Sequence, residues 1–144
     1  MKKYLVILFM LSLIQLVHAQ TQAEMNKKAW DDFAKADQKL NDVYKKILFV
    51  YADNKQFIKK LKTAQVAWIK FRDAHLESVY SASNQQVEYG SMFPMCYSME
   101  EQIITEARIK QLEQWLNGVE EGDTCSGSRM RPADVQERLK NYKK

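Results

Sequence analysis

Glycine and proline are scarce in this sequence of 144 residues, which contains four of the first and two of the second. Residues 20–80 contain neither. A fold made of many short strands needs frequent turns, and glycine and proline supply most of those turns. Their scarcity therefore argues against a β-rich fold and predicts long helices.

Histidine and cysteine are equally rare, with two of each. Since His18 lies in an N-terminal segment that we expect to be removed, His75 is the only histidine of the remaining chain. One histidine, two cysteines and scattered carboxylates have none of the ligand spacings typical of zinc sites. A glycine-rich phosphate loop is also absent. The sequence therefore predicts no metal site and no cofactor.

The first twenty residues, MKKYLVILFMLSLIQLVHAQ, have the pattern of a secretory signal peptide. Lys2 and Lys3 precede an apolar run over residues 4–17, and Val17 and Ala19 place small side chains where signal peptidase reads them. The run is short for a membrane span, no second run follows it, and no cysteine near the cleavage site could carry a lipid. We expect cleavage after Ala19 and an exported soluble protein, periplasmic or secreted, with no stable membrane anchor.

Positive and negative charges are nearly balanced once this segment is removed. Loss of Lys2 and Lys3 leaves 20 basic residues against 18 acidic ones, a formal net charge of +2. That charge is too small to predict a polyanion partner, and export argues against nucleic acid as a partner. The remaining chain, about 125 residues, is long enough for one domain with a single core.

Cap residues and apolar spacing predict two long helices before residue 81. Thr21 and Glu24 form a capping box that opens a helix over residues 22–51. Asp53-Asn54-Lys55-Gln56 offers a cap for a second helix over residues 54–81. Apolar side chains recur at helical spacing along one face of each segment, so these faces should be buried. Aromatic residues at that spacing, here and in the next helix, are expected in the core: Trp30, Phe33, Tyr44, Trp68, Phe71 and Trp115.

A third helix is expected over residues 98–117, opened by Ser98 and closed by Gly118. Pro132 suits the first turn of a short last helix. The predicted fold class is therefore all-α, an antiparallel bundle of three main helices plus a short C-terminal helix. We divide the chain into a signal peptide at 1–19, a helical domain at 20–118 and a tail at 119–144.

Charged residues lie in the apolar stripes, where an unpaired charge is costly. Arg72 of the second helix should lie at the same depth as Asp37 of the first, so an ion pair is expected between them. Asp73 is expected to reach toward Arg108 of the third helix. We interpret these residues as a structural ion-pair network. The alternative is a recognition or catalytic site built from Arg72, Asp37 and His75, in which the histidine would act as a general base.

Cys96 and Cys125 form an even pair, and in an exported chain such a pair is expected to form a disulfide. The bond would hold the tail to the start of the third helix and contribute roughly 3–4 kcal/mol. Two reduced or metal-bound thiols are the alternative.

Short motifs distributed along the chain resemble those of a known family. They are TQAEMN at 21–26, Ala36-Asp37, Leu40-Asn41, AQVAWIKFRD at 64–73, YGSMFP at 89–94 and TEARIKQL at 105–112. In this order they are similar to the N-terminal domain of lysozyme inhibitor LprI-like proteins. The positions that match the family's motif are Asp37, Asn41, Gln65, Trp68, Arg72, Asp73 and Arg108. The resemblance implies a small, exported, all-α bacterial domain with no established catalytic activity.

The resemblance favours a non-catalytic envelope protein that binds a macromolecule, either lysozyme, which it would inhibit, or another envelope protein. The segment 81–95 is too long and irregular for a tight turn, and such loops often carry recognition. Its candidate contact residues are Glu88, Tyr89, Gly90, Ser91, Met92 and Phe93, and the acidic run 120–123 is a second local candidate. The alternatives are a small envelope hydrolase around His75 and Arg72, and a structural or stress-related envelope domain without a single ligand.

Overall fold

The computed structural model describes the backbone of residues 2–122 and 124–142, and the side chains of residues 21–122 and 125–142. Every regular element in these ranges is helical, which confirms the all-α fold class. The elements are α1 (Lys2–Val50), α2 (Lys55–Val79), α3 (Gln85–Tyr89), the 3-10 turn η1 (Gly90–Met92), α4 (Phe93–Asn117), the 3-10 turn η2 (Thr124–Ser126) and α5 (Pro132–Leu139).

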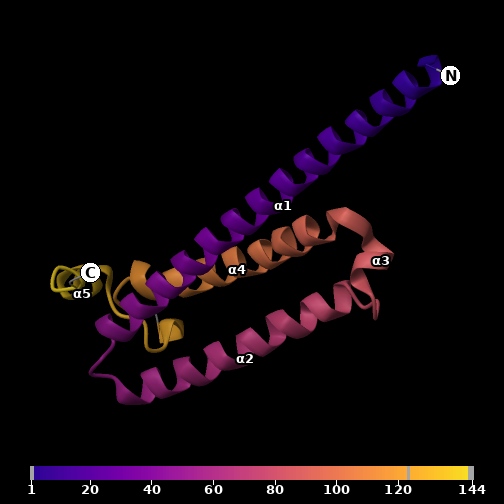
Figure 1. The fold of residues 1–144 in the computed structure, drawn as a ribbon. Coiled ribbons are helices and arrows are strands. Elements are labelled where there is room, and N and C mark those ends of the chain that lie inside the picture. Colours follow the sequence, from indigo (N-terminus) through magenta and orange to yellow (C-terminus); the bar gives the residue numbers. More distant parts are fainter. Residues whose placement is uncertain (1, 123, 143–144) are drawn as a thin grey trace.

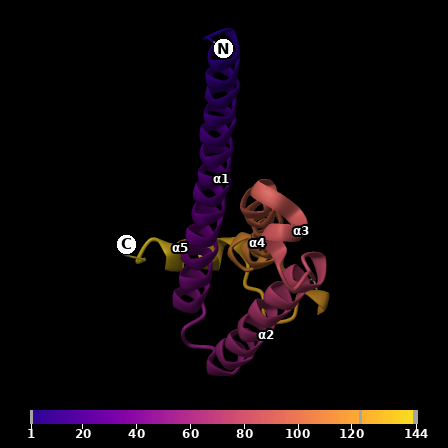
Figure 2. The same cartoon turned by 45° about the vertical axis from the view of Figure 1, so that its right-hand side comes forward.

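Helices α1 and α4 run in the same direction and α2 runs in the opposite one (Figure 1), so α1 and α4 are parallel neighbours and α2 is antiparallel to both. Helix α1 packs chiefly against α4, and α2 packs against α4 rather than against α1. Figure 2 shows α2 leaning away from α1. The bundle of three main helices with a short C-terminal helix is therefore confirmed, but α4 is the helix that holds the other two.

The core lies where α1 ends, α2 begins and α4 ends. Its buried side chains come from all four of the longer helices: Leu40, Val43, Ile47, Val50, Tyr51, Phe57, Leu61, Ile109, Leu112 and Val135. The second half of α2 adds only one fully buried residue, Leu76. Burial of apolar area, worth about 25 cal/mol per Å², is thus concentrated at one end of the bundle.

Two helix starts differ from the sequence prediction. Helix α1 runs without a break from Lys2, so a start at the Thr21 capping box is wrong for the full chain. The reason is that no glycine or proline interrupts residues 2–50, and a cap signal alone does not end a preceding helix. Helix α4 begins at Phe93, with Pro94 in its first turn, and Ser98 is buried inside the helix. Its end at Gly118 and the start of α5 at Pro132 are confirmed.

The expectation that the aromatic residues are core is wrong for two of them. Trp30 and Phe71 are each 58% exposed. Because α2 leans away from α1 and no fourth long helix follows among the described residues, the faces that carry these rings have no helix to pack on. Trp68 and Trp115 do pack against the core.

The tail docks on the bundle without the expected disulfide, since Cys96 and Cys125 are not bonded to each other. Cys96 lies in the first turns of α4, whereas Cys125 lies in η2, beyond the opposite end of that helix (Figure 1). A disulfide needs Cα atoms within about 7 Å, and a 25-residue helix separates the two by far more. The tail is held instead by the fully buried Val135 and by hydrogen bonds from Met130 and Arg138.

An acid titration tests this docking. Arg138 donates to both carboxylate oxygens of Asp53, at 2.7 and 2.9 Å, and to the carbonyl oxygen of Val50 at 2.7 Å. The hydrogen bonds from Arg138 to its carboxylate lower the pKa of Asp53 from 3.8 to about 2. Because the folded-state pKa lies below the unfolded one, the stability from this pair is present above about pH 4 and is lost as the pH falls through the folded-state pKa.

We expect Arg138→Gln to return the titration midpoint of the Asp53 carboxyl toward 3.8, as measured by NMR of its side-chain carbon. A midpoint that does not move would show that Arg138 does not hold Asp53 in solution.

Candidate functional site

Arg72 pairs with carboxylates of α2 and α4 rather than with Asp37 of α1. Its Nε and Nη2 donate to Asp73 Oδ1 at 3.0 and 2.9 Å, and its Nη1 lies 3.7 Å from Glu101 Oε1. Asp37 accepts a hydrogen bond from Asn41 at 3.0 Å. The predicted ion pair between Arg72 and Asp37 is therefore wrong, because α2 packs on α4 and α4 supplies the carboxylate.

Arg108 of α4 also differs from the expectation, since its partners are amides and not Asp73. Its Nε donates to the buried Gln65 of α2 at 3.1 Å, and its Nη1 donates to Gln111 at 3.1 Å. Two cations contact the indole of Trp68, with the guanidinium of Arg72 at 5.6 Å and that of Arg108 at 5.8 Å from a ring centroid. Such cation–π contacts are worth about 0.5–2 kcal/mol each. The network joins α2 to α4.

Burial acts on the charged members of this network. It raises the pKa of Glu101, against the lowering effect of Arg72, and it lowers the pKa of Arg108. The charged forms of both side chains are thus partly desolvated.

Five of the seven matching positions line one groove between α1 and α2, with a volume of about 550 Å³. They are Asp37, Asn41, Gln65, Trp68 and Arg72. Helices α1 and α2, which line this groove, diverge from each other (Figure 2). That these residues serve a structural role remains our interpretation, which their mutual contacts support.

His75 is half-buried, and its Nε2 lies 3.3 Å from Glu100 Oε1. The hydroxyl of Ser78 donates to the backbone carbonyl of His75, not to the imidazole. Arg72 is already paired. The geometry therefore gives no support to a hydrolytic site built on His75 and Arg72. Among the described residues, no group of three or more histidine, cysteine or carboxylate side chains could hold a metal ion.

The segment expected to be an irregular loop is instead folded into α3 and η1. Asn84 caps α3 by accepting a hydrogen bond from the backbone N–H of Val87 at 3.2 Å. Gly90, with φ of 69°, allows the chain to turn from α3 into η1. Asn26 of α1 donates to the carbonyl of Ser91 at 3.2 Å, and this hydrogen bond joins α1 to η1.

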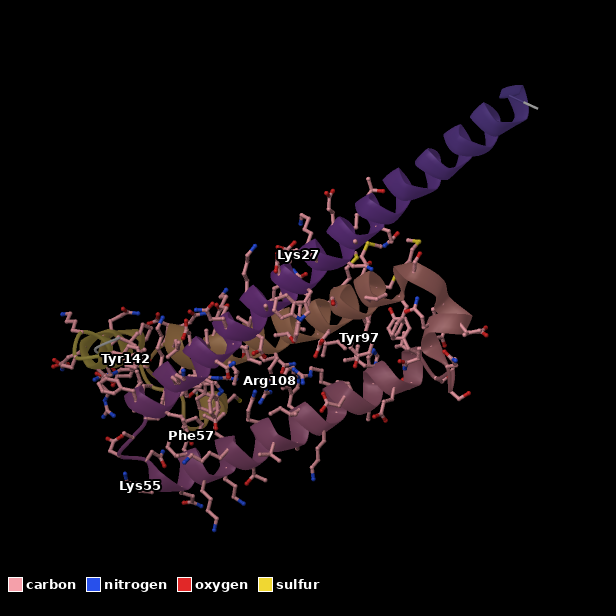
Figure 3. All side chains as sticks on the ribbon, viewed as in Figure 1. Lys27, Lys55, Phe57, Tyr97, Arg108 and Tyr142 are labelled. Carbon is pink, nitrogen blue, oxygen red and sulfur yellow. The ribbon has the colours of Figure 1, made fainter. Side chains whose placement is uncertain are left out.

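Four aromatic rings pack together where the end of α2 meets α3 and the start of α4. Tyr80 contacts Tyr89, Phe93 and Tyr97, with ring centroids 5.5, 5.3 and 5.6 Å away. Figure 3 shows Tyr97 on the side of α4 that faces the end of α2. Desolvation and nearby acidic groups raise the pKa of both Tyr80 and Tyr97. This aromatic cluster joins α2, α3 and α4 and fixes the position of α3.

The six candidate contact residues divide by exposure. Glu88, Ser91 and Met92 are exposed, whereas Tyr89, Gly90 and Phe93 are half-buried, and both aromatic residues belong to the cluster. Sequence reasoning missed Val87, which is 79% exposed on α3. Its apolar side chain in a short segment rich in polar residues is the signal that could have found it.

One further signal in the sequence was hidden by the small net charge. Residues 73–107 contain no lysine or arginine, although the chain has 22 of them. The same range contains six carboxylates: Asp73, Glu77, Glu88, Glu100, Glu101 and Glu106. It folds into one end of the bundle, made of the last turns of α2, then α3, η1 and the first half of α4 (Figure 1). We call this region the acidic end.

The neighbouring part of α1 adds little positive charge to the acidic end. Its exposed lysines are already paired within α1, Lys27 with Asp31 and Lys28 with Asp32. Arg72 partly neutralises Asp73 and Glu101, and the Nε2 of His75 lies 3.3 Å from Glu100 Oε1. Glu77 and Glu88 are exposed.

Comparison with known families identifies the chain. The sequence profile described as lysozyme inhibitor LprI matches residues 15–112, more than half of the sequence. The chain belongs to this family. The LprI match contains the whole acidic end and the groove, and it excludes η2 and α5. LprI is named for inhibition and not for catalysis, in accord with the expectation of a non-catalytic protein.

A search of curated proteins finds no match, and neither does a search of solved structures. Within the part of the chain that the structure describes, no helix is both long and apolar enough to cross a membrane.

Proposed function

We propose that this protein is exported, loses residues 1–19 and inhibits lysozyme by binding it through the acidic end. One observation carries the proposal: six carboxylates and no lysine or arginine are gathered in residues 73–107, which form one end of the bundle. Membership of the LprI family supports lysozyme as the partner.

Charge is the first argument for this surface. Lysozyme is a strongly basic enzyme, and an acidic surface attracts a basic partner before contact and orients it. The remainder of the chain holds all 22 basic residues and 12 of the 18 acidic ones. A basic partner is therefore drawn to the acidic end and repelled from the opposite end.

Shape and exposure are the second argument. Val87 and Met92, 79% and 49% exposed, provide apolar surface beside the carboxylate of Glu88. The aromatic cluster beneath them is packed on two long helices, so little conformational entropy is lost when a partner binds. Rigid apolar contacts surrounded by charge are typical of protein interfaces. The half-buried rings of Tyr89 and Phe93 belong to this cluster and pack against each other.

A lysis assay with charge-reversed variants tests the proposal. Glu77→Lys combined with Glu88→Lys should weaken inhibition of lysozyme at least tenfold, or about 1.4 kcal/mol, because two exposed carboxylates of the acidic end become repulsive. Both side chains are exposed, so the fold should tolerate the two substitutions.

The matched control is Glu120→Lys combined with Glu137→Lys, which makes the same change in net charge outside the acidic end. Inhibition by this control should stay within about twofold of the original protein, since long-range attraction is screened at physiological salt. Equal losses in the two variants would show that the acidic end is not the binding surface. If the unmodified protein does not inhibit lysozyme at all, the lysozyme proposal is wrong.

A further inference from the structure

A second candidate site lies between the first half of α2 and the second half of α4, at the end of the bundle opposite α3. It is a pocket of about 480 Å³, within the range of small-molecule sites. Its lining residues are Phe57, Lys60, Leu61, Ala64, Arg108, Gln111, Leu112, Gln114, Trp115 and Arg129. Figure 3 shows Phe57 and Arg108 in the space between the two helices.

The charged residues of this pocket all have one sign. Lys60, Arg108 and Arg129 contribute three cations, and no carboxylate lines the pocket. The two guanidinium groups donate to neutral amides: Arg108 to Gln65 and Gln111, and Arg129 to Gln114 at 3.0 Å. Among the residues that the structure describes, neither arginine has a carboxylate partner. Their positive charge therefore remains available to an anion.

One hydrogen-bond donor of a residue that lines the pocket has no acceptor among the described residues. The Nε of Arg129 is buried and unpaired among the described residues. A buried donor without an acceptor costs about 1–3 kcal/mol, and more when it is charged. A carboxylate or phosphate oxygen is a stronger acceptor for such a group than a neutral amide.

The floor of the pocket is apolar and aromatic. Phe57, Leu61 and Leu112 are buried, and the rings of Phe57 and Trp115 are 4.3 Å apart at their centroids. The guanidinium of Arg129 lies 5.2 Å from the centroid of the Trp115 ring. Cations thus surround an apolar floor, an arrangement suited to a ligand with a charged head and an apolar body.

We propose that this pocket binds an amphipathic anion, whose carboxylate or phosphate head is held by Arg108 and Arg129 and whose apolar chain lies along Phe57 and Trp115. The ligand is either a free anionic amphiphile or an anionic lipid in a bilayer, which share this chemistry. The site uses none of the residues of the acidic end, so it does not depend on the proposed inhibition of lysozyme.

Calorimetric titration with sodium octanoate tests this site, using protein purified from cells that express the full chain. Octanoate should bind at one site, at least tenfold more tightly than inorganic phosphate, which lacks the chain, and than octanol, which lacks the charge. Vesicles with and without an anionic phospholipid distinguish the two sources. Binding of octanoate alone indicates a free amphiphile, and binding of anionic vesicles as well indicates a lipid in a bilayer.

Variants assign the binding to the pocket. Arg129→Gln should weaken octanoate binding roughly tenfold. Lys60→Gln removes an exposed cation that the fold does not need, and it should weaken octanoate binding about threefold. Lys110→Gln removes an exposed cation from another face of α4 and should change the affinity less than about twofold. Should Arg129→Gln fail to fold, the comparison of Lys60→Gln with Lys110→Gln decides.

Four results would overturn the proposal. They are absence of octanoate binding at millimolar concentration, phosphate binding as tight as octanoate, octanol binding as tight as octanoate, and equal losses in Lys60→Gln and Lys110→Gln.

Discussion

Gly118→Ala is expected to lower the free energy of unfolding by roughly 3 kcal/mol or more. Gly118 ends α4 with φ of 76° and ψ of −176°, a conformation that only glycine adopts readily. A Cβ atom there would lie 2.7 Å from the backbone nitrogen of Pro132 and 2.8 Å from the carbonyl oxygen of Met130. Since backbone atoms cannot rotate away, the tail would have to move off the bundle. Urea denaturation followed by circular dichroism measures the change.

Gly127→Ala is the matched control for this prediction. Gly127 also has a positive φ, of 63°, but a Cβ atom there would meet nothing within 4 Å. It should cost only about 1 kcal/mol, the penalty of the backbone conformation alone. Equal costs at the two positions would mean that the tail does not pack on Gly118 in solution.

Replacement of Tyr51 should have the second large effect on stability. Tyr51 is fully buried at the end of α1, and its ring centroid lies 4.8 Å from that of Phe57 and 5.7 Å from that of Trp115. Its hydroxyl donates to the carbonyl of Trp115 at 2.9 Å and accepts from the backbone N–H of Met130 at 3.0 Å. Tyr51→Ala should therefore cost about 3–5 kcal/mol, as other large aromatic truncations in cores do.

Tyr51→Phe separates the hydroxyl from the ring. It should cost about 1–3 kcal/mol, because the N–H of Met130 and the carbonyl of Trp115 lose their partner in a buried place. Tyr142→Phe, on a half-buried tyrosine that contacts the ring of Phe49, is the control and should change stability by less than about 0.5 kcal/mol. A neutral Tyr51→Phe would show that water replaces both hydrogen bonds and that the tail is not fixed there.

Local signals in the sequence were sufficient where one residue decides the backbone. Gly118 ends α4 and Pro132 begins α5, both as predicted. The cap expected within residues 53–56 is the side chain of Asn54, which accepts from the N–H of Phe57. The start of α1 was not predictable in this way, because the capping box at Thr21 follows a segment that is itself a good helix former.

The partners of buried side chains were harder to predict, because apolar spacing shows which face of a helix is buried but not which helix covers it. The positions of Arg72 and Asp37 along their helices are consistent with an ion pair, and yet α2 turns Arg72 toward Glu101 of α4. The same difficulty explains the cysteines. The disulfide was predicted because the chain has an even number of cysteines, and this took no account of α4, whose length separates Cys96 from Cys125.

The candidate contact surface was partly predictable. Recognition was assigned to residues 88–93 on the length of the segment, and that segment does lie at one end of the bundle (Figure 1). Its fold into α3 and η1 depends on Asn84, on Gly90 and on aromatic contacts with Tyr80, which are separated in the sequence. The absence of basic residues from 73 to 107 was visible in the sequence, but a single net charge for the whole chain averages it away.

The central claim, that the acidic end binds lysozyme, is tested most directly by calorimetric titration of lysozyme with residues 20–144 at low and at physiological salt. The account predicts one-to-one binding that weakens as salt rises, because the attraction between an acidic surface and a basic enzyme is screened. It also predicts at least tenfold weaker binding by the variant with Glu77→Lys and Glu88→Lys. Absence of binding at both salt concentrations, or binding that this variant leaves unchanged, would contradict the account.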